Sequence, residues 1–145
     1  MSFIVGPVPD ARPLRQRLSP PVLLAGGLLL ASLALHVRDP HRSGAYGYCP
    51  WLLLTGTYCP GCGGLRAVND LTHGNVGAAA SSNLLFVALL PLLAVFWLRW
   101  VHDAITGVRR TVHPRRALWY AGGVLALAVA FAVVRNLPVG AWLAP

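Results

Sequence analysis

Three long apolar runs dominate this 145-residue sequence and leave little polar sequence to cover them. They occupy residues 20–37, 84–101 and 117–137, and each approaches the ~20 residues with which an α-helix crosses ~30 Å of hydrocarbon. Only 11% of the residues are charged, whereas soluble domains typically contain about 25%. A soluble fold would have too few polar residues to wrap three such helices, so we predict an all-α, integral membrane three-helix bundle.

Local signals refine the ends of these spans. Ser19 is the expected N-cap of the first helix, with Pro20 and Pro21 in its first turn. Pro91 is expected to kink the second helix, because a proline interrupts the hydrogen bonds of the helix. The other predicted segments are a disordered tail (1–19), a cysteine-bearing loop (38–83), a connection (102–116) and a C-terminal tail (138–145).

The distribution of arginine predicts the orientation of the bundle. The formal charge is +8, no lysine is present, and the arginines cluster in residues 1–19 and 102–116. Positively charged segments stay in the cytoplasm, so we expect a cytoplasmic N-terminus with the cysteine loop and C-terminus extracytoplasmic. Richness in Ala, Arg and Gly suggests a bacterial genome, and hence a bacterial inner membrane. Neither a basic stripe nor a groove-reading motif is present, so no nucleic-acid partner is predicted.

The segment of residues 38–83 is too apolar to extend freely into water, so we expect it to lie at the membrane interface. Short helices are predicted from Leu65 to about Leu71 and from about Val76 into the second span. Arg66 and Asp70 are one helical turn apart, which would allow them to pair.

The most distinctive motif is a cluster of cysteines, Cys49, Cys59 and Cys62, with no other cysteine in the chain. Cys59 and Cys62 are separated by Pro60 and Gly61, which favour the turn that brings two sulfurs together. Gly63 and Arg66 complete the motif.

Several interpretations of this cluster stay open. A structural disulfide suits an oxidising outer face. A redox pair would use Cys59 and Cys62 with Cys49 as resolving thiol, its thiolate favoured by Arg66 and a following helix N-terminus. A metal site would take its four ligands from the three cysteines and His73. Free thiols that only pack are the remaining reading.

Arg135 ends an otherwise charge-free run, so its guanidinium must reach the interface or find a partner. In the predicted orientation it emerges on the same side as the cysteines. We therefore hypothesise that Arg135 and Asn136 tie the third helix to the cysteine loop, through Asp70 or through backbone carbonyl groups.

Two separated motifs resemble a known family. Cys59-Pro60-Gly61-Cys62-Gly63 with Arg66, followed by Asn83 and a late Arg135-Asn136-Leu137-Pro138, is similar to the bacterial membrane family called domain of unknown function 2752. That family usually has Asn-Pro where this chain has Asn83-Leu84. The resemblance implies a small multi-pass membrane protein with a cysteine motif and implies no reaction.

No complete catalytic set is visible, so our first hypothesis is a non-enzymatic accessory or partner-binding component without a cofactor. Its expected partners are the lipid bilayer and either another membrane protein or a second copy of the chain. Gly26-Gly27 and Gly122-Gly123 would permit close helix approach. The alternatives are a membrane thiol-disulfide oxidoreductase and a metal-binding membrane protein.

Overall fold

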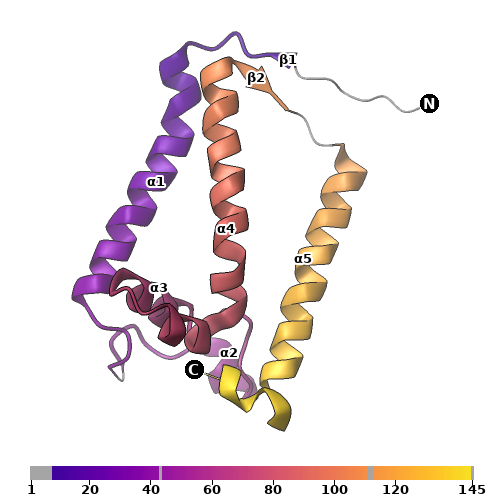
Figure 1. Cartoon of the computed structure of the whole chain (residues 1–145). Coiled ribbons are helices and arrows are strands. Elements are labelled where there is room, and N and C mark those ends of the chain that lie inside the picture. Colours follow the sequence, from indigo (N-terminus) through magenta and orange to yellow (C-terminus); the bar gives the residue numbers. More distant parts are fainter. Residues whose placement is uncertain (1–7, 43, 111–112, 145) are drawn as a thin grey trace.

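The computed structural model describes residues 8–42, 44–110 and 113–144. Three long helices meet a group of short elements at one end of the molecule (Figure 1). The elements in chain order are β1 (Val8–Pro9), α1 (Leu14–Val37), α2 (Pro50–Thr55), α3 (Gly64–Thr72), α4 (Val76–Thr106), β2 (Val108–Arg109), α5 (Pro114–Arg135) and the 3-10 helix η1 (Pro138–Leu143). The two short strands pair antiparallel.

The helices α1, α4 and α5 are each long and apolar enough to cross a membrane. Their large apolar side chains face outward, as Leu125 in α5 does with 65% of its surface exposed. Such exposure is unfavourable in water and favourable in lipid. The predicted all-α, three-span membrane architecture is therefore confirmed.

Helix α1 begins at Leu14, upstream of its expected start, and Ser19 lies inside it. The Ser19 hydroxyl donates to the carbonyl of Gln16 at 3.2 Å. That carbonyl would otherwise bond the N–H four residues on, which Pro20 lacks, so Ser19 compensates for the proline instead of capping the helix. Residues 8–17 thus hold a strand and a helical turn where a disordered tail was expected, and residues 1–7 lie outside the described residues.

Within α4, the backbone departs from helical angles at Asn83 (φ −158°, ψ 90°) and not at Pro91, where the kink was expected. The Asn83 side chain explains this position, because its Oδ1 accepts from the N–H of Phe86 at 2.9 Å. Asn83 therefore acts as an N-cap for the apolar part of α4. Residues 76–82 form a separate short helix before it.

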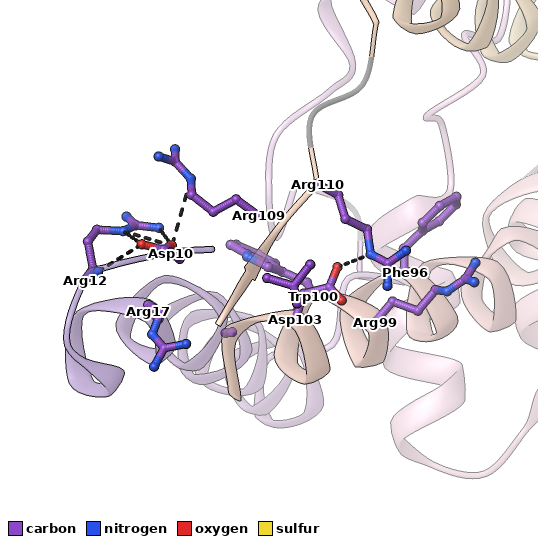
Figure 2. Close-up of a pocket in the computed structure, with 11 residues that line it drawn as sticks. Asp10, Arg12, Arg17, Phe96, Arg99, Trp100, Asp103, Arg109 and Arg110 are labelled. Atoms are coloured by element: carbon purple, nitrogen blue, oxygen red, sulfur yellow. Dashed lines mark hydrogen bonds and ion pairs between the residues drawn. The ribbon is translucent and has the colours of Figure 1, made fainter. Parts of the chain in front are cut away.

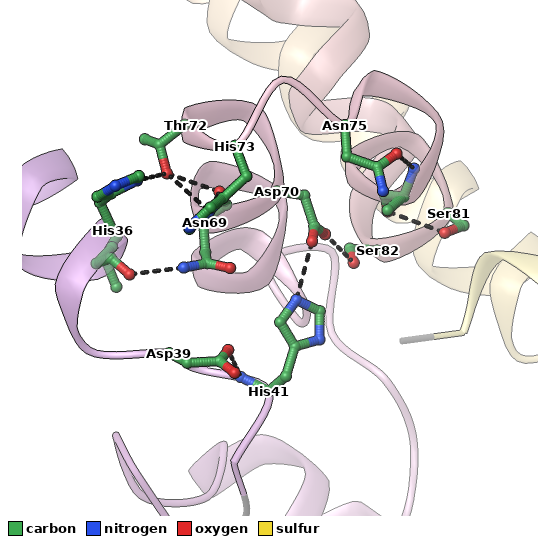
Figure 3. A network of polar contacts seen from close by, with 12 residues as sticks. His36, Asp39, His41, Asn69, Asp70, Thr72, His73, Asn75, Ser81 and Ser82 are labelled. Atoms are coloured by element: carbon green, nitrogen blue, oxygen red, sulfur yellow. Dashed lines mark hydrogen bonds and ion pairs between the residues drawn. The ribbon is translucent and has the colours of Figure 1, made fainter.

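Helices α1 and α4 pack against each other, and α3 packs across both at one end (Figure 1). Three polar contacts fix α3 there (Figure 3). Asn69 Nδ2 donates to the Leu35 carbonyl at 2.7 Å, Ser82 Oγ donates to Asp70 Oδ2 at 3.0 Å, and His41 Nε2 lies 3.0 Å from Asp70 Oδ1. The predicted pairing of Asp70 with Arg66 is wrong, because Ser82 and His41 occupy both carboxylate oxygens.

Helix α5 stands apart from α1 and α4 over most of its length and joins the rest of the molecule at its C-terminal end (Figure 1). The 3-10 helix η1 contacts both α5 and α4 there. The attachment of the third span thus depends on the few residues around Arg135.

Candidate metal centre

The three cysteine sulfurs converge on one point at the end of the bundle. Cys59 Sγ lies 3.1 Å from Cys62 Sγ and 3.6 Å from Cys49 Sγ. All three sulfurs lie within 4.8 Å of one another, and among the described residues this is the one group of three or more potential metal ligands of the His, Cys, Asp or Glu type. Convergence of three thiols from different positions along residues 49–62 favours one metal ion bound by all three.

The same distances overturn the predicted disulfide. A disulfide holds its sulfurs about 2.05 Å apart, and even the closest pair here exceeds that by more than 1 Å. All three cysteines are free. Cys59 Sγ lies between the other two sulfurs and is bonded to neither.

Local backbone geometry brings the sulfurs together. Cys49 precedes α2, which ends at Gly56 in the left-handed region (φ +67°), so the chain reverses toward Cys59. Between Cys59 and Cys62 the chain turns, with the Cys62 N–H donating to the Cys59 carbonyl at 3.2 Å. Gly63 is also left-handed (φ +80°) and starts α3. A side chain at Gly56 or Gly63 would strain the turn that it forms.

Every carbonyl group from Tyr58 to Cys62 accepts a hydrogen bond. The Gly64 N–H donates to the Gly61 carbonyl at 3.0 Å. Asn83 Nδ2 donates to Pro60 at 2.9 Å and to Cys62 at 3.1 Å, although its side chain belongs to α4. The turn that carries two of the three sulfurs is therefore fixed from outside as well as from within.

Arg135 supplies the second external attachment. Its Nη1 donates to the carbonyls of Cys59 (2.9 Å) and Cys62 (3.0 Å), and its Nη2 donates to that of Leu143 (2.8 Å). The residue is 1% exposed, with its guanidinium over the rings of Phe131 and Tyr58. A buried cation against the cysteine turn lowers the free-energy cost of negative charge on the sulfurs.

Asn136 pairs with the residue before the turn. Its Nδ2 donates to the Tyr58 carbonyl, and its Oδ1 accepts from the Tyr58 N–H, both at 2.8 Å. Arg135 and Asn136 thus reach the cysteine loop through backbone groups, and Asp70 is not their partner. The sequence indicated this link but not its geometry.

The thiols differ in acidity. Backbone N–H groups, chiefly that of Leu52, stabilise the Cys49 thiolate and hold the pKa of Cys49 below its ordinary value. Burial disfavours the thiolate of Cys62 and raises the pKa of that thiol to about 12 in the absence of a metal. A cation bound among the sulfurs would remove this penalty, because metal coordination deprotonates a thiol.

His73 is not part of the cluster, which corrects the predicted fourth ligand. It follows α3 at the end opposite the cysteines, and nine helical residues span about 13 Å. Its ring stacks on that of His36 with centroids 4.2 Å apart, and its Nδ1 lies 2.9 Å from the Asn69 carbonyl (Figure 3). Contacts with α1 therefore account for this histidine.

A pocket of about 660 Å³ lies beside the sulfurs. Arg66, Gly63 and Tyr48 line it together with the three cysteines. Sequence reasoning placed Arg66 near the thiols but missed Asn83 as a support of the turn. The signal available for Asn83 was its position immediately before an apolar run.

A known family matches the part of the chain that carries the cysteines. The model of the family described as "Protein of unknown function (DUF2752)" matches residues 49–97. Residues 49–97 are thus similar to the DUF2752 family. The DUF2752 segment begins at Cys49, contains all three cysteines and Asn83, and ends before α5, so Arg135 and Asn136 lie outside it. The family prediction is confirmed over this segment, and no curated protein and no solved structure matches the chain.

Proposed function

We propose that this protein is a non-enzymatic component of a bacterial inner membrane whose three cysteines bind one zinc ion. The convergence of Cys49, Cys59 and Cys62 Sγ atoms within 4.8 Å carries this proposal. Thiolates around tetrahedral zinc, at Zn–S of about 2.3 Å, lie ~3.8 Å apart. The observed separations of 3.1 and 3.6 Å are close to that value, so small side-chain adjustments would place the sulfurs around the ion.

The spacing of the ligands supports the same ion. Two cysteines separated by two residues are typical of structural zinc sites. Three protein thiolates leave a fourth position, which water or a group from a partner would occupy through the adjacent pocket. Three thiolates and Zn²⁺ sum to one negative charge, and the buried Arg135 guanidinium opposes that charge.

We assign the site a structural role because hydrogen bonds already saturate the turn between Tyr58 and Cys62. An ion held there would fix α2, α3, α4 and α5 relative to one another. Such a rigid end suits an accessory component that presents its surface to a membrane-protein partner or to a second copy of the chain.

The proposed orientation keeps the N-terminus and residues 102–116 in the cytoplasm and the cysteines outside. It is supported by the arginines of residues 8–19 and 99–110. The start of α1 and the strands β1 and β2 lie at the end of the bundle opposite α2 and α3 (Figure 1). An alkaline phosphatase fused after Gly107 should be inactive, and one fused after Ala144 should be active. The reverse pattern would refute this orientation.

A membrane thiol-disulfide oxidoreductase is the second candidate. The lowered pKa of Cys49 favours it, because a thiolate is the attacking form in thiol exchange. In that case Cys59 and Cys62 would be oxidised to a disulfide while a partner's disulfide is reduced to two thiols, and a dithiol partner would reverse the exchange.

Metal loading separates the two candidates. Protein purified in detergent under reducing conditions and equilibrated with zinc should retain one zinc per chain, measured by plasma mass spectrometry. Cys62→Ser should abolish retention, whereas His73→Ala should retain zinc like the parent because His73 lies away from the sulfurs. A parent protein without zinc, whose Cys59 and Cys62 equilibrate with a glutathione buffer, would refute the metal site and support the oxidoreductase.

A further inference from the structure

A second pocket lies at the opposite end of the bundle, between α1, α4 and the two short strands (Figure 2). It has a volume of about 530 Å³, and five arginines and two aspartates are among its lining residues. The arginines are Arg12, Arg17, Arg99, Arg109 and Arg110. None of them belongs to the cysteine site.

The two carboxylates neutralise only part of this charge. Arg12 Nη2 lies 2.7 Å from Asp10 Oδ2, and Arg110 Nε lies 2.7 Å from Asp103 Oδ2. Arg109 is a more distant neighbour of Asp10, at 3.9 Å. Arg17 and Arg99 form no ion pair within the described residues. The pocket thus retains a surplus of positive charge available to an anion.

Arg17 is positioned with an unused donor. Its Nε is buried and has no hydrogen-bond partner among the described residues. The guanidinium lies against Gly107, the left-handed residue that ends α4 (φ +72°), and a side chain at Gly107 would collide with it. An unpaired buried donor is costly, and an anionic oxygen in the pocket would relieve that cost.

The wall beside the arginines is apolar and faces outward. Phe96 and Trp100 on α4 line the pocket, and they are 59% and 42% exposed. Both belong to the end of a helix long enough to span the membrane. A ligand that fills this pocket therefore meets cations at one side and an aromatic, lipid-facing surface at the other, which is the character of an amphiphile.

We propose that this pocket binds the phosphate headgroup of an anionic phospholipid, with the acyl chains along Phe96 and Trp100. Basic pockets between spanning helices bind anionic headgroups by this combination of charge and apolar contact. A zwitterionic headgroup would bring its own cation into a site with surplus positive charge. Free phosphate would use the arginines but gain nothing from the aromatic wall.

Native mass spectrometry of the full chain in detergent tests this proposal. The probes are phosphatidylglycerol, phosphatidylcholine of the same acyl chains, and inorganic phosphate. Phosphatidylglycerol should bind at least tenfold more tightly than either of the others. Equal binding of phosphatidylcholine would refute charge recognition, and equal binding of inorganic phosphate would refute a lipid site.

Matched variants locate the site. Arg17→Gln with Arg99→Gln should weaken phosphatidylglycerol binding about thirty-fold, because each substitution removes a direct charge-assisted contact to the headgroup that contributes on the order of fivefold. Arg15→Gln with Arg116→Gln removes the same charge from exposed positions outside the pocket and should change binding less than about threefold. Equal weakening by both pairs would show a general surface field and overturn the pocket.

A single substitution keeps the test independent of folding. Arg99→Gln alters an exposed position on α4 and should weaken phosphatidylglycerol binding about fivefold. Unchanged binding in Arg99→Gln, with the helical circular dichroism of the parent, would also overturn the proposal. Zinc retention has no part in these measurements, so the two sites can fail separately.

Discussion

Different kinds of interaction stabilise the two ends of the bundle. At the cysteine end, the buried side chains of Asn83 and Arg135, with the exposed amide of Asn136, bond backbone carbonyls from Tyr58 to Cys62. At the arginine end, ion pairs between exposed arginines and largely covered carboxylates, together with two-residue strands, make the contacts. Bonds from buried side chains to the backbone fix a geometry, whereas ion pairs with an exposed arginine tolerate rearrangement, so the first end suits an ion with fixed ligand directions and the second suits a mobile headgroup.

The sharpest expected difference lies among the thiols themselves. In metal-free protein, the Cys49 pKa lies below the ordinary thiol value while burial raises the Cys62 pKa to about 12. Cys49 therefore carries more thiolate than Cys62 near neutral pH. Iodoacetamide should therefore modify Cys49 first and Cys62 only as the pH approaches 12, as peptide mass spectrometry would show. Equal rates at both cysteines at pH 8 would contradict the burial of Cys62.

Loss of Arg135 should give the largest change in stability. Arg135→Ala removes three hydrogen bonds from a charged donor, and we expect it to lower the free energy of unfolding by about 3–5 kcal/mol. Denaturation in mixed micelles measures this. Arg116→Ala, at an exposed position on the same helix, is the control and should lie close to the parent. A small effect of Arg135→Ala would mean that α5 is attached by other contacts.

Replacement of Asn83 should have a smaller effect. Asn83→Ala removes the cap on Phe86 and two bonds to the cysteine turn, and we expect a loss of about 2–3 kcal/mol. It should also weaken zinc binding, because the turn loses an external support. Ser81→Ala serves as the control, since that hydroxyl bonds only the Ala78 carbonyl within its own helix segment. Comparable losses in both variants would argue against a special role for Asn83.

The ion pairs of the arginine end should matter least to folding. Arg12 holds the pKa of the Asp10 carboxyl near 2, from an ordinary 3.8. A depressed pKa favours the folded state above pH 3.8 and loses that effect as the pH falls toward 2. Because the Arg12 side chain is exposed, Arg12→Ala should leave the thermal unfolding midpoint at pH 7 nearly unchanged, and salt should reduce any difference. A large drop in the unfolding midpoint of Arg12→Ala would show that the arginine end contributes to stability as much as the cysteine end.

Much of the fold was readable from the sequence because lipid imposes simple rules. Apolar runs of spanning length predicted α1, α4 and α5, and the amphipathic stretch from Leu65 predicted α3. The first helix was predicted to start too late, because Ser19 resembles a cap unless its bond to the Gln16 carbonyl is known. The break in α4 was assigned to Pro91, since proline is the usual cause of kinks, whereas a side-chain bond places it at Asn83.

The site was only partly readable. Clustering of cysteines identified the correct loop, and the isolated charge of Arg135 predicted its attachment to that loop. Sequence spacing could not show that all three sulfurs converge on one point, nor that α3 carries His73 away from the cluster. Both depend on distances across the fold, which one-dimensional spacing does not contain.

Zinc-edge X-ray absorption on the purified, zinc-loaded full chain tests the shared cysteine site most directly. Three sulfur neighbours at about 2.3 Å should appear in the first coordination shell. A first shell of nitrogen and oxygen alone would contradict a common ion at Cys49, Cys59 and Cys62. Protein that takes up no zinc, and whose sulfur-edge spectrum shows a disulfide, would contradict it as well.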